Sequence, residues 1–303
     1  MPGPHPPTMP PPGAAPVPPR TALVFGGSGQ VGAAVIDALL AGGWRIVAVS
    51  RGHRPARTGV QWLRGDLAAA GGMPPGVDAV LSCGPLDAFA QWFARGTVAC
   101  GRVVAFGSTS VVVKQASADD GERSLAGRLA QAERAITEEA ARRGIPATLL
   151  RPTLVYGAGR DRTLSRIASI AARLGVFALP RDAKGLRQPV HVHDLAAAAV
   201  AALQRQAPGT RTYDLPGGET LAYEAMVART LAALSPPPRL LRLPSPLFAL
   251  AAALAGLAGM QGFNAAARAR MRQDLVFDAA AARGDLGYAP RAFQPDVAML
   301  LPR

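Results

Sequence analysis

The chain has 303 residues, 49% of them hydrophobic, which is enough to bury a sizeable core in one large domain or two modest ones. Its formal net charge of +13 comes almost entirely from arginines spread along the chain, without a dense basic run interleaved with aromatic residues, and this argues against a nucleic-acid partner. Cys83 and Cys100 form neither a CxxC pair nor a zinc-ligand spacing, which indicates a reduced, cytoplasmic chain without a metal site.

Residues 1–20 carry proline at nearly every second position, no aromatic residue and almost no charge. Such a segment cannot bury enough apolar surface to fold, so we expect a disordered leader. It lacks the basic and apolar regions of a secretory signal. Ordered structure is expected to begin near Arg20.

The stretch from Thr21 to Val35 joins an apolar strand, three spaced glycines and the start of a helix. Gly26 permits a tight strand-to-helix turn, Gly29 lets the backbone approach a pyrophosphate, and Gly32 lets the helix pack against the strand. The helix N-terminus adds unpaired N–H groups and a partial positive charge. The pattern predicts a dinucleotide site, with an ordinary glycine-rich turn as the alternative.

The second strand, Trp44 to Ser50, ends where the adenosine ribose of such a cofactor is expected. In NAD-binding versions of the site, a carboxylate about 20 residues past the glycines binds the ribose hydroxyls. Here Ser50 is followed by Arg51, whose guanidinium suits a 2′-phosphate. We therefore expect NADP, with NAD as the second choice; the alternative is that Arg51 is simply solvated.

Strands and helices then alternate along the chain. Strands are predicted over 61–66, 77–85, 101–110, 147–157 and 211–216, and helices over 122–143, about 163–174 and from near 223. The strand over 101–110 ends in Ser108, Thr109 and Ser110, and such strand ends line the ligand crevice of an open parallel sheet. We expect an α/β fold: a Rossmann-type doubly wound parallel sheet over 21–157 with returning segments near 190–216, and a smaller C-terminal substrate lobe taking up most of 158–303.

An uncharged run between Pro244 and Met260 is too short to span a bilayer, which needs about 20 residues. We expect a helix packed in the small lobe. A helix that lies on a membrane surface or binds a partner is the alternative.

Over about residues 21–293 the chain resembles the NAD-dependent epimerase/dehydratase family, a group of extended or atypical short-chain dehydrogenases/reductases. The resemblance rests on the glycines described above and on five further segments: Gly65-Asp66-Leu67, 108–110, Arg151-Pro152 with 155–157, 187–196 and the closing run 277–290.

The resemblance implies roles for individual residues. Ser28, Gly29, Gln30 and Val31 would cradle the pyrophosphate, and Asp66 and Leu67 would contact the adenine. Thr109 would hydrogen-bond the reacting carbonyl or alcohol. Arg187 would bind substrate phosphates, with Arg268, Arg270 or Arg272 as a second phosphate ligand. Each has a structural alternative: Asp66 caps a turn, Thr109 satisfies strand-end amides, and the arginines are solvated.

The family's Tyr-x-x-x-Lys proton relay is missing. Leu125 and Leu129 stand at its two positions, and none of the four tyrosines is followed by lysine four residues later. Lys114 is the only lysine close to the predicted crevice, pointing either into the site or into water.

Two hypotheses follow. The first is an NADP-binding, epimerase/dehydratase-like oxidoreductase acting on a sugar-nucleotide or a related carbonyl or alcohol. The second is a catalytically silent cofactor-binding protein with a structural or redox-sensing role. A homodimer is compatible with both, and membrane contact is not expected.

Overall fold

The computed structural model describes residues 19–69, 71–161, 163–257 and 265–301. Most of the expected leader, residues 1–18, lies outside this part, as does the end of the apolar run, residues 258–260. Within the described ranges, no helix combines the length and apolar character that a membrane crossing requires.

Seven parallel strands form the central sheet, in the order β13-β8-β7-β5-β1-β2-β3. The inner strands are nearly continuous apolar runs because helices cover both faces of the sheet. The strands are β1 (Thr21–Phe25), β2 (Arg45–Ser50), β3 (Val60–Arg64), β5 (Ala79–Ser82), β7 (Val103–Phe106), β8 (Ala147–Pro152) and β13 (Thr210–Leu215).

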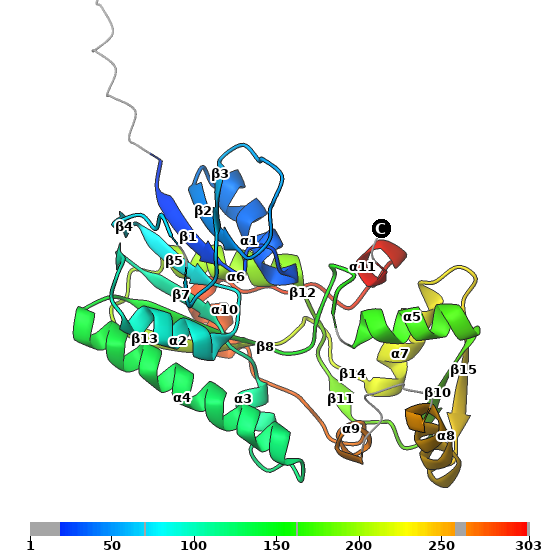
Figure 1. Ribbon diagram of the computed structural model, residues 1–303. Helices are drawn as coiled ribbons and strands as arrows, with labels where there is room; N and C mark the ends of the chain where they lie inside the picture. Colours follow the sequence, from blue (N-terminus) through cyan, green and yellow to red (C-terminus); the bar gives the residue numbers. More distant parts are fainter. Residues whose placement is uncertain (1–18, 70, 162, 258–264, 302–303) are drawn as a thin grey trace, which may run out of the picture.

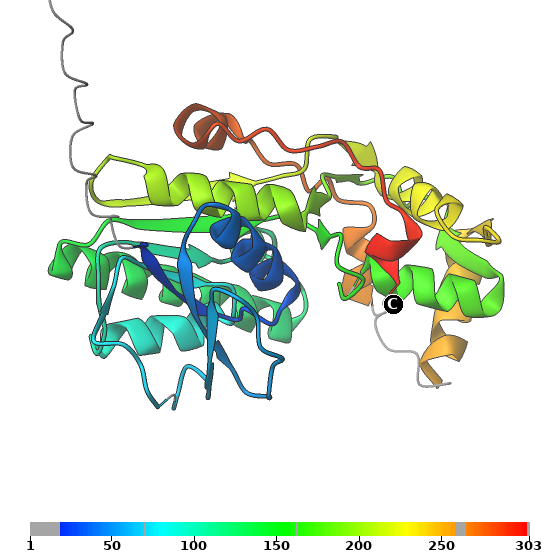
Figure 2. The same cartoon turned by 90° about the horizontal axis from the view of Figure 1, so that it is seen from above.

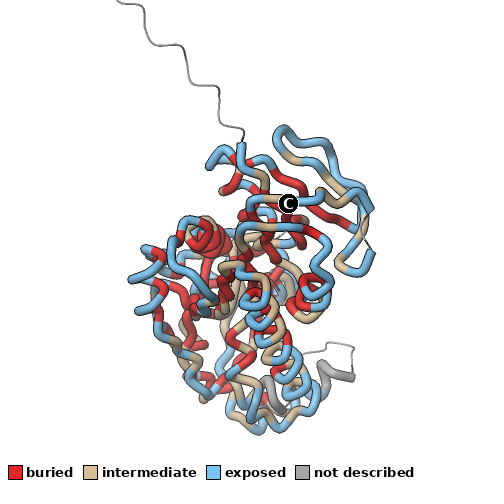
Figure 3. Tube along the Cα trace, turned by 90° about the vertical axis from the view of Figure 1, so that its left-hand side faces the viewer, coloured by how far each residue is buried: buried red, intermediate tan, exposed pale blue. Residues whose placement is uncertain are grey.

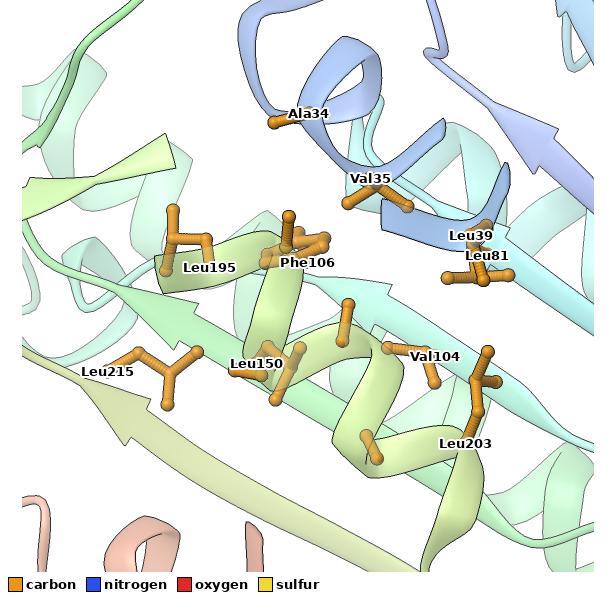
Figure 4. Packing of buried hydrophobic residues seen from close by; sticks show 14 of the residues in the cluster. Ala34, Val35, Leu39, Leu81, Val104, Phe106, Leu150, Leu195, Leu203 and Leu215 are labelled. Atoms are coloured by element: carbon orange, nitrogen blue, oxygen red, sulfur yellow. The ribbon is translucent and has the colours of Figure 1, made fainter. Parts of the chain in front are cut away.

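Two helical layers enclose this sheet. On one face α1 (Gln30–Ala41) packs against α6 (Val192–Gln204), and on the other α2 (Leu86–Ala94) packs against α4 (Asp120–Arg143). Figure 4 shows the first layer, where Val35 of α1 and Leu195 of α6 belong to the same buried cluster as sheet residues such as Leu150. Figure 3 shows buried positions gathered in the interior and exposed positions around the outside. This arrangement confirms the expected doubly wound α/β fold.

A smaller lobe with its own apolar core lies beside the sheet in Figures 1 and 2. It contains α5 (Leu164–Leu174), α7 (Tyr223–Ala232), α8 (Ser245–Leu257), α9 (Ala265–Arg270), α11 (Val297–Leu300), and the paired strands β10 (Val176–Pro180) and β15 (Arg239–Leu243). Short strand pairs join the lobes or edge the sheet: β9 (Val155–Tyr156) with β12 (Val190–His191), β11 (Leu186–Arg187) with β14 (Leu221–Ala222), and β4 (Gly76–Val77) with β6 (Ala99–Cys100).

The chain returns to the first lobe twice. The first return is α6 with β13, near the expected segment 190–216. The second is α10 (Ala280–Leu286), which follows the small lobe and packs on α6 and β13. This second return was not expected, because a short helix near the end of the chain carries no local sign of the lobe that it joins.

The apolar run forms α8, and α8 packs on β10. Phe248 is buried, whereas Leu247 and Leu250 are exposed. The helix is therefore present in the small lobe as expected, with part of its apolar surface open to solvent.

Candidate cofactor and substrate site

The glycine loop lies where the strand order reverses, because β1 has β2 on one side and β5 on the other. The Gly29 N–H donates to the Gly26 carbonyl at 2.9 Å, which closes the turn. Gly26 has φ +70°, and a Cβ there would lie 2.7 Å from the Cys83 carbonyl carbon; a Cβ at Gly32 would overlap the Gly26 carbonyl oxygen. Only glycine fits these two positions, and the loop has the shape that a dinucleotide site requires.

A first cavity of about 330 Å³ lies between this loop and the ends of β2 and β3. Five of the predicted cofactor residues line it: Gly26, Ser28, Arg51, Asp66 and Leu67. The Asp66 carboxylate accepts hydrogen bonds from the Ala68 and Ala69 N–H groups at 2.9 and 3.0 Å. These bonds, with a smaller contribution from the charge of Arg51, hold the pKa of Asp66 below its usual value. Asp66 thus caps a turn, and its contact with adenine remains a prediction.

Two arginines follow the end of β2: Arg51 lines this cavity, and Arg54 bonds to Ser50, which also lines it. Arg51 lines it with an exposed side chain. Arg54 was not predicted; its Nε donates to the Ser50 Oγ at 3.2 Å. Its position four residues after Ser50 was the only signal in the sequence. The segment after β2 is irregular, so its side-chain directions could not be predicted from a helix or strand period.

A second cavity of about 540 Å³ is also lined by residues of the glycine loop, and Ser28 lines both cavities. Its described lining is Ser28, Gly29, Gln30, Thr153, Leu154, Val155, Arg160, Asp161 and Thr163. The buried Oε1 of Gln30 has no hydrogen-bond partner in the described structure, while Val31 packs against the apolar core between the sheet and the layer of α1 and α6. Two cavities lined by one glycine loop suit the two halves of a dinucleotide.

Thr109 is buried at the end of β7, just before α3 (Ser110–Val113). Its hydroxyl and its backbone N–H both donate to the Pro152 carbonyl, each at 3.2 Å. Beside it, the Ser110 N–H donates to the Ser108 Oγ at 3.1 Å. Thr109 therefore serves a strand-end backbone group, and the substrate roles of these three hydroxyls remain predictions.

Lys114 lies within 3.4 Å of a Glu122 carboxylate oxygen at the start of α4. The same carboxylate pairs with Arg270 of the small lobe and accepts a hydrogen bond from the Ser117 hydroxyl at 2.8 Å. We call Lys114, Ser117, Glu122 and Arg270 the interlobe clasp. Lys114 thus points at a carboxylate, and not freely into the crevice or water as expected.

Leu125 and Leu129, at the two relay positions, are half-buried on α4. Leu129 packs against the apolar core between the sheet and the layer of α2 and α4. All four tyrosines, Tyr156, Tyr213, Tyr223 and Tyr288, lie in the interior. Burial raises the pKa of each, that of Tyr213 to about 12. No tyrosine of this chain is therefore placed to form a phenolate near neutral pH.

Arg187 is buried, and its guanidinium donates to the carbonyls of Leu186, Arg270 and Gln273 and lies 5.2 Å from the Tyr223 ring. Burial lowers the pKa of Arg187. Arg187 thus holds the segment after α9 against β11, and its contact with a phosphate remains a prediction. Among the other expected ligands, Arg272 pairs with Asp182 at 2.8 Å and Arg268 is half-buried.

In the described part of the chain, no group of three or more His, Cys, Asp or Glu residues is arranged to hold a metal ion.

Residues 90–215 match the model of the NAD dependent epimerase/dehydratase family. The 2-alkyl-3-oxoalkanoate reductase of Stenotrophomonas maltophilia (strain K279a) is 30% identical over 251 residues, covering 71% of this chain and 76% of that protein. The chain belongs to the NAD-dependent epimerase/dehydratase family.

Solved structures share the fold at low identity. MoeE5 in complex with UDP-glucose and NAD superposes with a TM-score of 0.66 at 20% identity, covering 90% of this chain and 94% of that one. UDP-glucuronic acid 4-epimerase from Bacillus cereus in complex with NAD superposes with a TM-score of 0.64 at 14% identity, covering 93% and 97%.

Proposed function

We propose that this protein, as a member of the epimerase/dehydratase family, is an NADP-dependent oxidoreductase. It would act on the carbonyl or alcohol group of a small anionic substrate. The observation that carries the proposal is the pair of cavities lined by the glycine loop, with Arg51 at the ribose end of the first. When bound, the nicotinamide supplies or accepts the hydride.

The residues of this chain would bind and orient that cofactor. Gly26, Ser28 and Gly29 shape the loop against which the pyrophosphate would lie, and Asp66 and Leu67 line the first cavity, where the adenine would bind. Arg51 would pair with a 2′-phosphate through charge-assisted hydrogen bonds. The alternative of NAD would leave the Arg51 guanidinium without an anion.

The substrate class follows from the crevice cations and the relatives. Arg187 lies against the backbone of α9, and Arg270 shares the Glu122 carboxylate with Lys114, so a substrate carboxylate or phosphate would bind here by taking the place of Glu122. The reductase relative favours a 3-oxo acid, and the structural neighbours favour a sugar-nucleotide. Oxidation of NADPH by acetoacetate, compared with reduction of NADP⁺ by the alcohol groups of UDP-glucuronate, would separate these two classes.

The proton must come from a group outside the usual relay, because neither Leu125 nor Leu129 can exchange one. Lys114 and a water held by Thr109 are the candidates on this chain, and a group of the substrate is the third. General acid–base help is worth about 10² to 10⁴ in rate, so turnover should be slow or narrow in scope.

The cofactor choice is tested by titrating NADPH and NADH into the protein and into Arg51→Asp. We expect tighter NADPH binding in the unmodified protein and a reversed preference in the variant, with a change of about tenfold or more, since charge-assisted hydrogen bonds contribute about 1.5–3 kcal/mol. Arg45→Asp, an exposed arginine at the opposite end of β2, is the control. Equal or tighter NADH binding by the unmodified protein would remove Arg51 from this role.

A catalytically silent cofactor-binding protein is the second candidate. It is favoured by the apolar relay positions and by the use of the Thr109 hydroxyl on the Pro152 carbonyl. Cofactor binding without hydride exchange to any carbonyl substrate would support it.

We also propose a cytoplasmic location, since Cys83 and Cys100 are both free. A homodimer remains a prediction that light scattering would check.

A further inference from the structure

The second cavity brings together the glycine loop and the connection between β8 and α5. Among its described lining residues Arg160 is the only cation, and its guanidinium reaches Ser28 of the loop. Ser28 and Arg160 are 132 residues apart in the chain. The cavity thus places one guanidinium beside the loop where a pyrophosphate is expected.

Arg160 is weakly held in this structure. Its side chain is exposed, and its Nη1 donates to the Ser28 carbonyl at 3.4 Å, the long end of hydrogen-bond distances. Among the described residues, no carboxylate lies within salt-bridge distance of it. The neighbouring Asp161 is buried and accepts hydrogen bonds from the Thr163 and Ser165 N–H groups and from the Ser165 hydroxyl. The positive charge of the Arg160 guanidinium is therefore not neutralised by a carboxylate of the described residues, and it can pair with an anion.

The backbone on both sides of Arg160 is fixed. The Gly159 N–H donates to the Met299 carbonyl at 2.8 Å, and Asp161 caps the first turn of α5. A ligand can thus recruit the guanidinium by a change of side-chain rotamer, without moving the connection.

We propose that Arg160 binds the pyrophosphate of the dinucleotide, exchanging the Ser28 carbonyl for phosphate oxygens, and so positions the second half of the cofactor in this cavity. A guanidinium can donate two parallel hydrogen bonds to a phosphate, whereas it donates one to the Ser28 carbonyl. The loop N–H groups would bind the pyrophosphate from one side and Arg160 from the other. The proposal rests on the proposed function for the identity of the ligand.

The test compares ligands that contain the pyrophosphate with one that lacks it. NADPH and NADH both carry it, whereas adenosine 2′-monophosphate fills only the cavity at Arg51. We expect Arg160→Ala to weaken NADPH and NADH by the same factor, about tenfold or more, and to change adenosine 2′-monophosphate less than twofold. Arg160→Lys should recover part of the loss, because it keeps the charge without the two-pronged geometry.

Two variants give the comparison. Arg51→Ala should weaken both NADPH and adenosine 2′-monophosphate, and Arg173→Ala, an exposed arginine on α5, should change neither. Unchanged NADPH and NADH affinity in Arg160→Ala would overturn the proposal and leave the proposed function standing. Equal losses for all three ligands would also overturn it, because they would indicate general damage to the site. Failure of the unmodified protein to bind either dinucleotide would overturn the proposed function as well.

Discussion

Leu125 and Leu129 set the catalytic question for this molecule. They occupy the two positions where the family places a tyrosine and a lysine, and no buried tyrosine replaces them. The hydroxyl of Thr109, the residue directly before α3, already donates to the Pro152 carbonyl. A retained binding loop and an absent relay therefore occur in the same crevice.

Restoring the relay with Leu125→Tyr and Leu129→Lys tests which hypothesis holds. If the protein is a silent binder, NADPH oxidation with carbonyl substrates should appear only in the double variant. Leu125→Phe with Leu129→Met is the control, since it keeps an apolar helix face without titratable groups. Robust turnover in the unmodified protein that survives both Lys114→Ala and Thr109→Ala would refute the silent-binder hypothesis and our assignment of the proton source.

His191 couples stability to pH. It is buried, its Nδ1 accepts from the His193 N–H, and its Nε2 has no partner in the described structure. Burial first, and then the charge of Arg291, lower its pKa from 6.5 to about 4. The groups around it also include the Tyr156 ring, Asp194 and Asp296.

The unfolded chain therefore binds this proton more readily than the folded one. The contribution of neutral His191 to the free energy of unfolding should be fully present above about pH 6.5 and be lost as the pH falls toward 4. The loss is about 3 kcal/mol, at about 1.36 kcal/mol for each unit of pKa difference between the unfolded and folded chain. Urea midpoints at pH 7.5 and 4.5 would measure this loss, and His191→Asn should make it smaller. His53→Asn, at an exposed position, should leave the pH dependence unchanged.

At the scale of the elements, the side chain of Asp161 caps the N-terminus of α5. Asp161 accepts from backbone N–H groups of the first turn and from the Ser165 hydroxyl, and it is buried. Helix N-termini leave four N–H groups without partners, so such a cap is valuable.

Asp161→Ala should lower the free energy of unfolding by about 2 kcal/mol, the upper end for a lost N-cap, because the freed groups are buried. Asp161→Asn should cost less, since its side-chain oxygen still accepts. Asp296→Ala, which removes the exposed cap of the short helix α11, gives the comparison and should cost less than 1 kcal/mol. If urea denaturation gives the same loss of unfolding free energy for Asp161→Ala and Asp296→Ala, the role given to Asp161 is contradicted.

At the scale of the whole molecule, the interlobe clasp joins the two lobes. The Glu122 side chain is 13% exposed and binds Lys114 of the same lobe and Arg270 of the small lobe, so a charged contact joins the two lobes. An ion pair at this depth should contribute more than a surface pair.

Glu122→Gln should lower the free energy of unfolding by about 1–2 kcal/mol, because it leaves two cations facing each other without a carboxylate. It should also increase amide hydrogen exchange over residues 265–273, which Arg270 ties to α4. Glu138→Gln, at an exposed position on the same helix, is the control and should change neither measurement. Unchanged exchange in Glu122→Gln would show that the lobes are held by other contacts.

The sequence by itself determined the alternating α/β architecture, the position of the glycine loop, the arginine at the end of β2 and the absence of the relay. Each depends on neighbours within about one element: the apolar period of a strand or helix, the spacing of glycines, or the residue that follows a strand. The return of α10 to the first lobe became visible only in the tertiary structure. So did the positions of Arg54 beside Ser50 and of Arg160 beside the glycine loop. The same holds for the clasp, whose Glu122 and Arg270 are 148 residues apart, and for Arg187, whose carbonyl partners lie up to 86 residues away. Such pairs form because folding brings the two lobes together, and no local pattern records which side chains will meet there.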